Sequence, residues 1–195
     1  MPQSTAGLIL AGGEGHRWGG PKAWAELPDR HTFLDACAAA LLGGGCRPVV
    51  ATLPPAETGP VPTGIDAVSL PASGIDMFGS LRIGLTALAD VPWGAVVVLP
   101  VDHPLVRART IRALAEASGP ASIPRLEGRH GHPIRLAREV AERIISGDLP
   151  GPTLREVLRE VGAEEVAVDD PGIRANCNTP ERLREAWSTR RPPPR

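Results

Sequence analysis

The sequence is poor in cysteine, in surplus charge and in long apolar runs. Its three cysteines are odd in number and lack C-x-x-C spacing, so they indicate neither a disulfide framework nor a zinc site. Lysine and arginine number 21 against 22 aspartates and glutamates, which leaves none of the basic surplus typical of nucleic-acid-binding proteins. No basic segment precedes the first apolar run, and glycines interrupt it, so we predict neither a signal peptide nor a membrane span. These absences favour a cytoplasmic protein with small-molecule partners, and with neither a nucleic acid nor a membrane among its partners.

Length and composition favour one compact α/β unit. At 195 residues with 42% hydrophobic side chains, the chain is long enough to enclose a sizeable core, and we expect a single domain over residues 1–189. Residues 53–63 contain four prolines and are expected to form a loop. Residues 190–195 read RRPPPR and are expected to be a disordered tail.

Short apolar runs alternate with segments of helical spacing, which predicts a mainly parallel sheet with helices on both faces. The expected strands lie at residues 7–11, 48–52, 67–70 and 95–99, with weaker ones at 121–124, 134–136 and 165–168. The expected helices lie at residues 32–42, 79–88, 108–117, 136–145, 153–161 and 180–187. Ser80 and Thr153 are the expected N-terminal caps of two of these helices.

The most informative segment is residues 8–22, which read LILAGGEGHRWGGPK. A short apolar run ends at five glycines, which let backbone amides approach a ligand closely. Exposed amides in a turn bind anions, and Arg17 and Lys22 add two positive charges, so the loop suits a triphosphate. The alternative is a glycine-rich corner with solvated cations.

Two common phosphate-binding templates do not fit this loop. A Walker A loop needs G-x-x-x-x-G-K-[ST], whereas Lys22 follows a proline and precedes Ala23. The dinucleotide pattern G-x-G-x-x-G, started at Gly13, would need a glycine where Trp18 stands.

Asp102 follows the most strand-like run in the chain, residues 96–99. Ligands of open parallel sheets gather at the carboxyl ends of the strands, so a carboxylate here is well placed for a site. Mg²⁺ takes hard oxygen ligands from one or two protein groups and from substrate phosphates. The sequence therefore predicts a Mg²⁺ ligand at Asp102. The alternative is an aspartate that caps the next helix or shapes the turn before Pro104.

The string L-A-G-G-x-G-x-R-x-G-G-P-K at residues 10–22 resembles the signature loop of the nucleotidyltransferases. Within them it is similar to the MobA-like and MocA-like group, the molybdenum-cofactor guanylyl- and cytidylyltransferases. Four further segments resemble this family in the expected order: Gly79-Ser80-Leu81-Arg82, Leu99-Pro100-Val101-Asp102-His103-Pro104, Gly131-His132-Pro133 and Asn176-Cys177-Asn178-Thr179-Pro180-Glu181. The resemblance covers nearly the whole chain.

The resemblance implies a Rossmann-like three-layer α/β/α fold with a mostly parallel sheet. It also implies a Mg²⁺ cofactor held by Asp102 and Asn178, with Asn176 two positions earlier on the same side of an extended segment. The alternative for Asn178 is an Asx turn that caps the next helix. The implied catalytic residues are Arg17, Lys22 and Asp102, and the implied nucleotide-binding residues are Leu10, Ala11, Gly12, Gly13, Gly15, Arg17, Lys22, Gly79 and Ser80.

Two features indicate where an acceptor binds. A helix expected to begin at Gly79-Ser80 would attract an anion through its free amides, and Arg82 would sit in its first turn. His132 lies in a loop beside several basic residues, whose alternative reading is a solvated surface. We therefore expect Arg82 and His132 to be acceptor-binding residues.

The expected function is Mg²⁺-dependent transfer of a nucleotide from CTP or GTP to a phosphate-bearing acceptor, with release of pyrophosphate. The resemblance favours a molybdopterin-type acceptor, and contact with a molybdoenzyme or a chaperone is a further expectation. Two alternatives stay open: a sugar-1-phosphate nucleotidyltransferase and a non-catalytic nucleotide-binding module. The Asn176/Asn178 pair and the bulky Met77-Phe78 favour the second of these.

Overall fold

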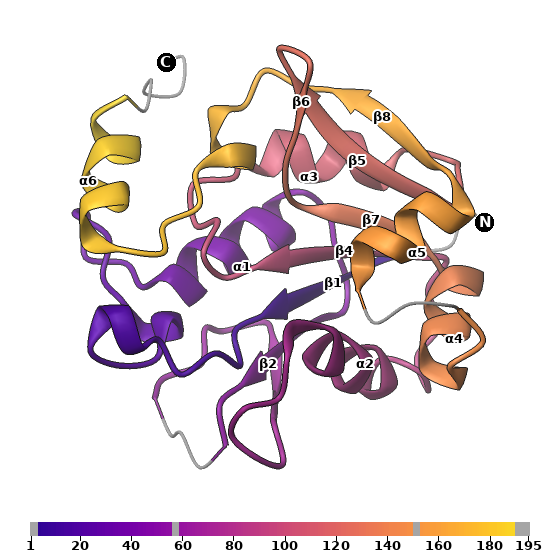
Figure 1. Cartoon of the computed structure of the whole chain (residues 1–195), viewed down its shortest axis with the longest axis horizontal. Helices are drawn as coiled ribbons and strands as arrows, with labels where there is room; N and C mark the ends of the chain where they lie inside the picture. The colour runs from indigo at the N-terminus through magenta and orange to yellow at the C-terminus, as the bar shows by residue number, and fades with distance from the viewer. Residues whose placement is uncertain (1–3, 56–58, 150–152, 190–195) are drawn as a thin grey trace.

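The computed structural model describes residues 4–55, 59–149 and 153–189 (Figure 1). Eight strands form one sheet in the order β3-β2-β1-β4-β7-β5-β6, with β8 paired to β5. The strands are β1 (Thr5–Leu10), β2 (Val49–Leu53), β3 (Asp66–Ser69), β4 (Ala95–Pro100), β5 (Ala121–Leu126), β6 (Arg129–His130), β7 (Ile134–Ala137) and β8 (Ala163–Ala167). The helices are α1 (Phe33–Gly43), α2 (Met77–Ala87), α3 (Ala108–Ala115), α4 (Arg138–Ser146), α5 (Leu154–Val161) and α6 (Pro180–Ser188), with short 3-10 helices η1 (His16–Trp18), η2 (Lys22–Trp24) and η3 (Pro171–Arg174).

The two central strands, β1 and β4, are parallel and end side by side. Leu10 pairs with Pro100 in the sheet register. The amide of Val101 then donates to the carbonyl oxygen of Leu10 at 3.0 Å. In Figure 1 both arrows point to the same side, where the glycine-rich loop and the C-terminal segment also lie. The loops that follow these strands therefore begin next to each other, which brings residues 11–22 close to Asp102.

Side chains along β1 alternate between two cores, one on each face of the sheet. Ile9 belongs to the core that α1, α3 and α6 cover, whereas Leu8 and Leu10 belong to the core that α2, α4 and α5 cover. Every residue of β4 is buried, as expected for a central strand with helices on both faces. These layers confirm the predicted α/β/α fold. Within the described ranges, no helix has the length and apolar character needed to cross a bilayer.

The structure corrects the expected start of α2. The helix begins at Met77, and Asp76 is its N-cap, with Oδ1 accepting from the amide of Gly79 at 2.7 Å. Ser80 is not a cap: it is buried in the first turns, and its hydroxyl shares a 2.8 Å hydrogen bond with Thr52. Asp76 is favoured over Ser80 as the cap because a carboxylate at a helix N-terminus accepts from a free amide and complements the helix dipole.

The structure also corrects the boundary near residue 136, which was expected in both a strand and a helix. Leu136 and Ala137 pair with β4 in an antiparallel register, so the helix α4 starts only at Arg138. The two-residue strand β6 was not predicted, because it consists of exposed polar residues. Thr153 is confirmed as the cap of α5. The expected tail at 190–195 and part of the 53–63 loop lie outside the described residues.

Candidate active site

Side chains from three distant parts of the chain meet at the carboxyl ends of β1 and β4. The ammonium of Lys22 donates to Asn178 Oδ1 at 2.6 Å and lies 3.8 Å from Asp102 Oδ2. The amide of Asn176 donates to the same Asp102 oxygen at 2.9 Å. The structure therefore brings Lys22, Asp102 and both asparagines into one cluster. Lys22 is also the single lysine in the sequence.

The alternative roles for Asp102 and Asn178 as helix caps do not describe the structure. Arg107 is the N-cap of α3, and Thr179 is the N-cap of α6, where its hydroxyl accepts from the amide of Arg182. Asn178 Oδ1 instead accepts from Lys22, and Asp102 Oδ2 accepts from Asn176 and pairs with Lys22.

The glycine-rich loop presents free amide donors beside this cluster. Within the described chain, no acceptor pairs with the amides of Gly12, Gly13 or Gly15. Gly15 has φ +65°, and a Cβ there would lie 1.9 Å from the carbonyl oxygen of Gly20. At Gly12 a Cβ would lie 2.2 Å from Leu70. Glycine is thus required sterically at Gly15, a side chain at Gly12 would displace the end of Leu70, and the turn that results can accept an anion.

The oxygen atoms of the cluster suit a cation. A positive group, the Lys22 ammonium, already lies between Asn178 Oδ1 and Asp102 Oδ2. One carboxylate and one amide oxygen are hard donors of the kind that Mg²⁺ and Mn²⁺ accept. The described residues contain no group of three or more His, Cys, Asp or Glu side chains that could hold a metal alone. Asp102 is the one carboxylate among the four clustered side chains.

A second set of contacts ties the loop and the C-terminal segment to Asp102. The indole Nε1 of Trp18 donates to the carbonyl oxygen of Cys177 at 3.1 Å, and the amide of Cys177 donates to the carbonyl oxygen of Asp102 at 2.7 Å. Burial, with the nearby Asp102 charge as a smaller cause, raises the pKa of the Cys177 thiol to about 12, so the thiol stays protonated. Cys177 is a structural residue of the site and not a nucleophile.

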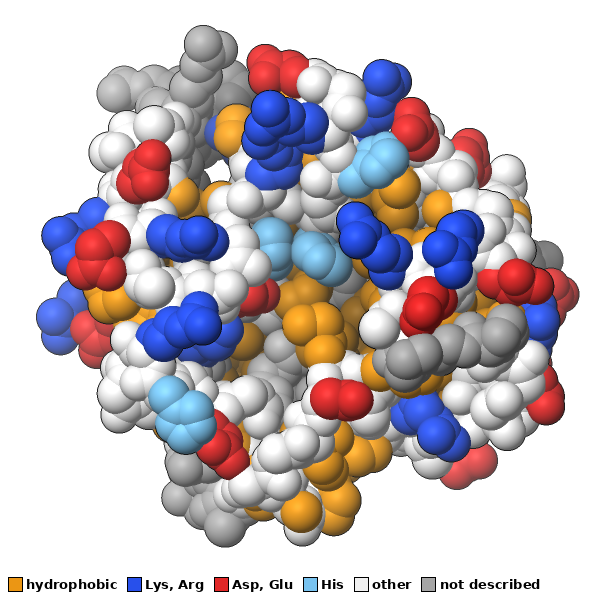
Figure 2. Space-filling model, in the orientation of Figure 1, with side chains coloured by type: hydrophobic (Ala, Val, Ile, Leu, Met, Phe, Trp, Pro, Cys, Tyr) orange, Lys and Arg blue, Asp and Glu red, His pale blue; other side chains and the backbone are white. Residues whose placement is uncertain are grey.

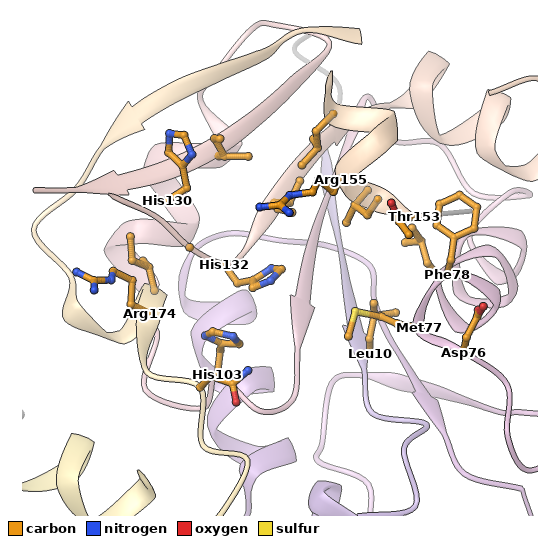
Figure 3. A pocket seen from close by; sticks show the side chains of 18 residues that line it. Leu10, Asp76, Met77, Phe78, His103, His130, His132, Thr153, Arg155 and Arg174 are labelled. Atoms are coloured by element: carbon orange, nitrogen blue, oxygen red, sulfur yellow. The ribbon is translucent and has the colours of Figure 1, made fainter. Parts of the chain in front are cut away.

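A cavity of about 840 Å³ opens beside the cluster. Figure 2 shows the hollow with an apolar floor, with histidine side chains next to it and arginine side chains around its rim. Figure 3 shows His103 and His132 on one side, with Leu10 and Met77 facing them. Arg155 of α5 and Arg174 of η3 also line the cavity. The cavity can hold a mainly apolar body with a few polar groups.

The two histidines of the cavity contact each other, and burial favours the neutral form of both rings. Their ring centroids lie 4.8 Å apart. Burial, and after it the neighbouring His103, lowers the pKa of His132 to about 4, and burial also lowers the pKa of His103. Among the described residues, Nδ1 of each ring is buried without a hydrogen-bond partner, as is Oδ1 of Asn176. These atoms leave unused hydrogen-bonding capacity near the cavity.

Other predicted site residues are exposed or are already hydrogen-bonded. Arg17 is exposed on η1, and its guanidinium has no ion-pair partner in the described part of the chain. The amides of Gly79 and Ser80 bond to Asp76, so they are not free for an anion. Arg82 is exposed, donates to the carbonyl oxygen of Ile145 at 3.3 Å and does not line the cavity. The anion site expected at the start of α2 is therefore a capped helix end.

Sequence reasoning did not single out several residues of the site. His103 stood next to Asp102 in the motif, and its pairing with His132 depends on the β4–β7 contact. Arg155 and Arg174 had no local signal. Trp18 appeared only as the residue that breaks a dinucleotide pattern, although its indole is the one group of η1 bonded to the C-terminal segment among the described residues.

The chain is similar in sequence to known proteins. The family model of the MobA-like NTP transferase domain matches residues 7–168. A Mycobacterium tuberculosis H37Rv protein named "Probable molybdenum cofactor guanylyltransferase" is 35% identical over 117 residues, which are 56% of this chain and 54% of that protein. The 2-C-methyl-D-erythritol 4-phosphate cytidylyltransferase of Streptomyces coelicolor is 32% identical over 136 residues, which are 63% of this chain and 50% of that protein. The chain thus spans about half the length of these relatives.

Solved structures share the fold along nearly the whole chain. The crystal structure of Rv0371c from Mycobacterium tuberculosis H37Rv superposes with a TM-score of 0.78 and 21% identity, over 97% of this chain and 100% of that chain. Its complex with manganese gives a TM-score of 0.74 and 23% identity, over 97% and 100%. A nucleotidyl transferase from Methanothermobacter gives 0.76 and 19%, over 96% and 99%. These likenesses establish the fold as that of Rossmann-like nucleotidyltransferases.

Proposed function

Because the chain belongs to the family of MobA-like NTP transferase domains, we propose that it is a nucleotidyltransferase that moves a nucleoside monophosphate from GTP or CTP to a phosphate-bearing acceptor. The observation that carries this proposal is the convergence of Lys22, Asp102 and Asn178 beside unpaired loop amides. Free amides and an ammonium favour a polyphosphate, and the adjacent oxygens favour the cation that accompanies it.

The protein's part in the reaction is alignment and neutralisation of charge. The acceptor phosphate attacks the α-phosphorus, and pyrophosphate leaves from the opposite side, so no protein nucleophile is needed. The amides of Gly12, Gly13 and Gly15 bind phosphate oxygens. Lys22 holds the α-phosphate or the acceptor phosphate, and the exposed Arg17 neutralises the leaving pyrophosphate.

Asp102 and Asn178 are the residues that would hold a divalent cation, which we propose is Mg²⁺. The cation, when bound, neutralises charge on phosphate oxygens. Support comes from the oxygen donors of the site and from the related structure that contains manganese. Because Asp102 is the one carboxylate in this cluster, we expect weak cation binding until a nucleotide adds its phosphate oxygens.

We propose a molybdopterin-type acceptor in the cavity beside the cluster. The apolar floor suits a flat ring system, the imidazoles of His132 and His103 line one side of it, and Arg155 and Arg174 favour a phosphate. Relatives named for molybdenum cofactor guanylyltransfer support this acceptor. Arg82 is left out of the proposed site because its guanidinium bonds to α4.

A smaller organic phosphate is the second candidate acceptor, because one relative is named for cytidylyl transfer to methylerythritol phosphate. The same assay separates the candidates. Pyrophosphate release is measured with GTP or CTP and Mg²⁺, with molybdopterin, with methylerythritol phosphate, with a sugar 1-phosphate, or with no acceptor. The proposal expects release that depends on molybdopterin and on Mg²⁺.

Asp102→Ala tests the assigned site in that assay. The variant should lose at least about 100-fold in kcat/KM, because it removes the carboxylate ligand and leaves Lys22 without an anion. Asp169→Asn is the control, since the Asp169 side chain is 92% exposed and its carboxylate pairs with Arg109 on the surface. Nucleotide binding without pyrophosphate release for any acceptor would instead establish a non-catalytic binding module.

A further inference from the structure

Trp18 links the glycine-rich loop to the C-terminal segment without using a charged group. Its indole donates to the carbonyl oxygen of Cys177, 159 residues away, at 3.1 Å. Its ring meets Phe33 edge-on, with centroids 5.2 Å apart and planes at 74°. Cys177 is buried, and its amide bonds to the backbone of Asp102 at 2.7 Å. The indole is therefore connected through one residue to the backbone that bears the Asp102 carboxylate.

The other side-chain link between the loop and this segment is the bond from Lys22 to Asn178. Lys22 is proposed to bind phosphate, and an ammonium that turns to a phosphate oxygen gives up or weakens its bond to an amide. The Trp18 bond joins a neutral donor to a backbone carbonyl, and the proposed chemistry uses neither group. This second link can remain in place while the first is exchanged for substrate contacts.

We propose that Trp18 is a positioning residue that keeps residues 12–22 and 176–178 aligned when substrate draws Lys22 away from Asn178. This inference rests on the proposed nucleotidyl transfer. Phenylalanine or methionine at this position would still pack against Phe33 but would lack the N–H donor. The indole N–H, and not the bulk of the ring, is therefore the feature that the alignment requires.

Trp18→Phe tests the inference, with Trp93→Phe as the matched control. Trp93 loses the same kind of bond, from Nε1 to the carbonyl oxygen of Leu88 at 2.8 Å, but it lies in the core on the other face of the sheet. Amide hydrogen exchange of residues 176–178, measured with GTP or CTP bound, should rise about two- to tenfold in Trp18→Phe, the equilibrium equivalent of one neutral hydrogen bond. Trp93→Phe should leave this segment unchanged relative to the rest of the chain.

Kinetic measurements distinguish a positioning role from a purely structural one. In Trp18→Phe we expect a two- to tenfold fall in kcat and a similar rise in the Mg²⁺ concentration for half-maximal rate, with the KM for nucleotide within about twofold of the original value. Unchanged exchange at residues 176–178, or changed exchange with unaltered kcat and Mg²⁺ requirement, would overturn the inference. If the unmodified protein releases no pyrophosphate, the proposed function fails, and the exchange data alone decide whether Trp18 aligns the two segments.

A second variant covers the case in which Trp18→Phe does not fold. The benzothienyl isostere of tryptophan, in which sulfur replaces the indole N–H, can be placed at position 18 by an expanded genetic code. It keeps the shape that packs on Phe33 and removes the donor to Cys177. The same increase in exchange supports the inference, and exchange equal to that of the unmodified protein refutes it.

Discussion

Gly15→Ala is the substitution whose effect the structure specifies most closely. Gly15 lies in the left-handed region at φ +65°, which costs a non-glycine residue about 1–2 kcal/mol. The new Cβ would also lie 1.9 Å from the carbonyl oxygen of Gly20, whereas Cβ contacts shorter than 3.0 Å are essentially never seen. The loop backbone must therefore move by about 1 Å, a displacement that can cost about 100-fold in a reaction governed by alignment.

Two neighbouring glycines provide controls within the same loop. Gly19 has φ +76° but open space at its Cβ, so Gly19→Ala tests the backbone cost alone. Gly20 has open space and no positive φ, so Gly20→Ala should behave like the unmodified protein. The assay is kcat/KM for pyrophosphate release, with the melting temperature measured in parallel. We expect the order Gly20→Ala, Gly19→Ala, Gly15→Ala from most to least active. An activity of Gly15→Ala within threefold of Gly20→Ala would refute the reasoning.

Three further predictions concern charge and burial. Lys22→Met should lower kcat/KM about 10- to 100-fold, the loss expected for a charge-assisted hydrogen bond, and bound nucleotide should protect this single lysine from an amine-reactive reagent in a mass-spectrometric assay. Asp170→Ala should cost about 3 kcal/mol in urea unfolding, because the buried carboxylate accepts from the Arg107 amide at 2.8 Å and the Thr110 hydroxyl at 2.6 Å; a loss below about 1 kcal/mol would contradict this. His132 has a folded-state pKa of about 4, below its ordinary 6.5, so its stabilising contribution is complete above pH 6.5 and is lost as the pH falls toward 4. Between pH 6.5 and 4, the free energy of unfolding should therefore decrease by roughly 2–3 kcal/mol less in His132→Asn than in the unmodified protein. An equal decrease in both proteins would show that other groups cause the pH dependence.

The fold was predictable where one local signal dominated. The short apolar runs of β1 and β4 predicted buried strands of a covered sheet, and Thr153 marked the start of α5. The start of α2 was misplaced because Gly79-Ser80 looked like a cap, whereas Asp76 supplies the stronger acceptor. The boundary at Leu136 depended on pairing with β4, which no window of nearby residues contains.

In the candidate site, too, residues with a local sequence signal were predictable, whereas contacts between distant segments were not. Lys22 and Asp102 were predictable because each follows a buried strand, and parallel neighbours deliver both to one edge of the sheet. The hydrogen bond from Trp18 to Cys177 joins residues 159 positions apart and depends on the path of the C-terminal segment. Periodicity and motif spacing therefore could not predict it. Arg82 is the opposite case: its motif position suggested an acceptor-binding residue, but its guanidinium donates to a backbone carbonyl of α4.

The asparagines beside Asp102 lie beyond the part of the chain that the family model matches. The matched region ends at residue 168, after the last strand of the sheet, whereas Asn176 and Asn178 enter the site from the chain beyond it. Apart from the first residues of β1, the strands of the sheet, the glycine-rich loop and Asp102 therefore lie within the matched part, whereas two of the side chains around Asp102 come from outside it. Replacing residues 175–179 would therefore change the surroundings of the Asp102 carboxylate without altering a single residue of the sheet.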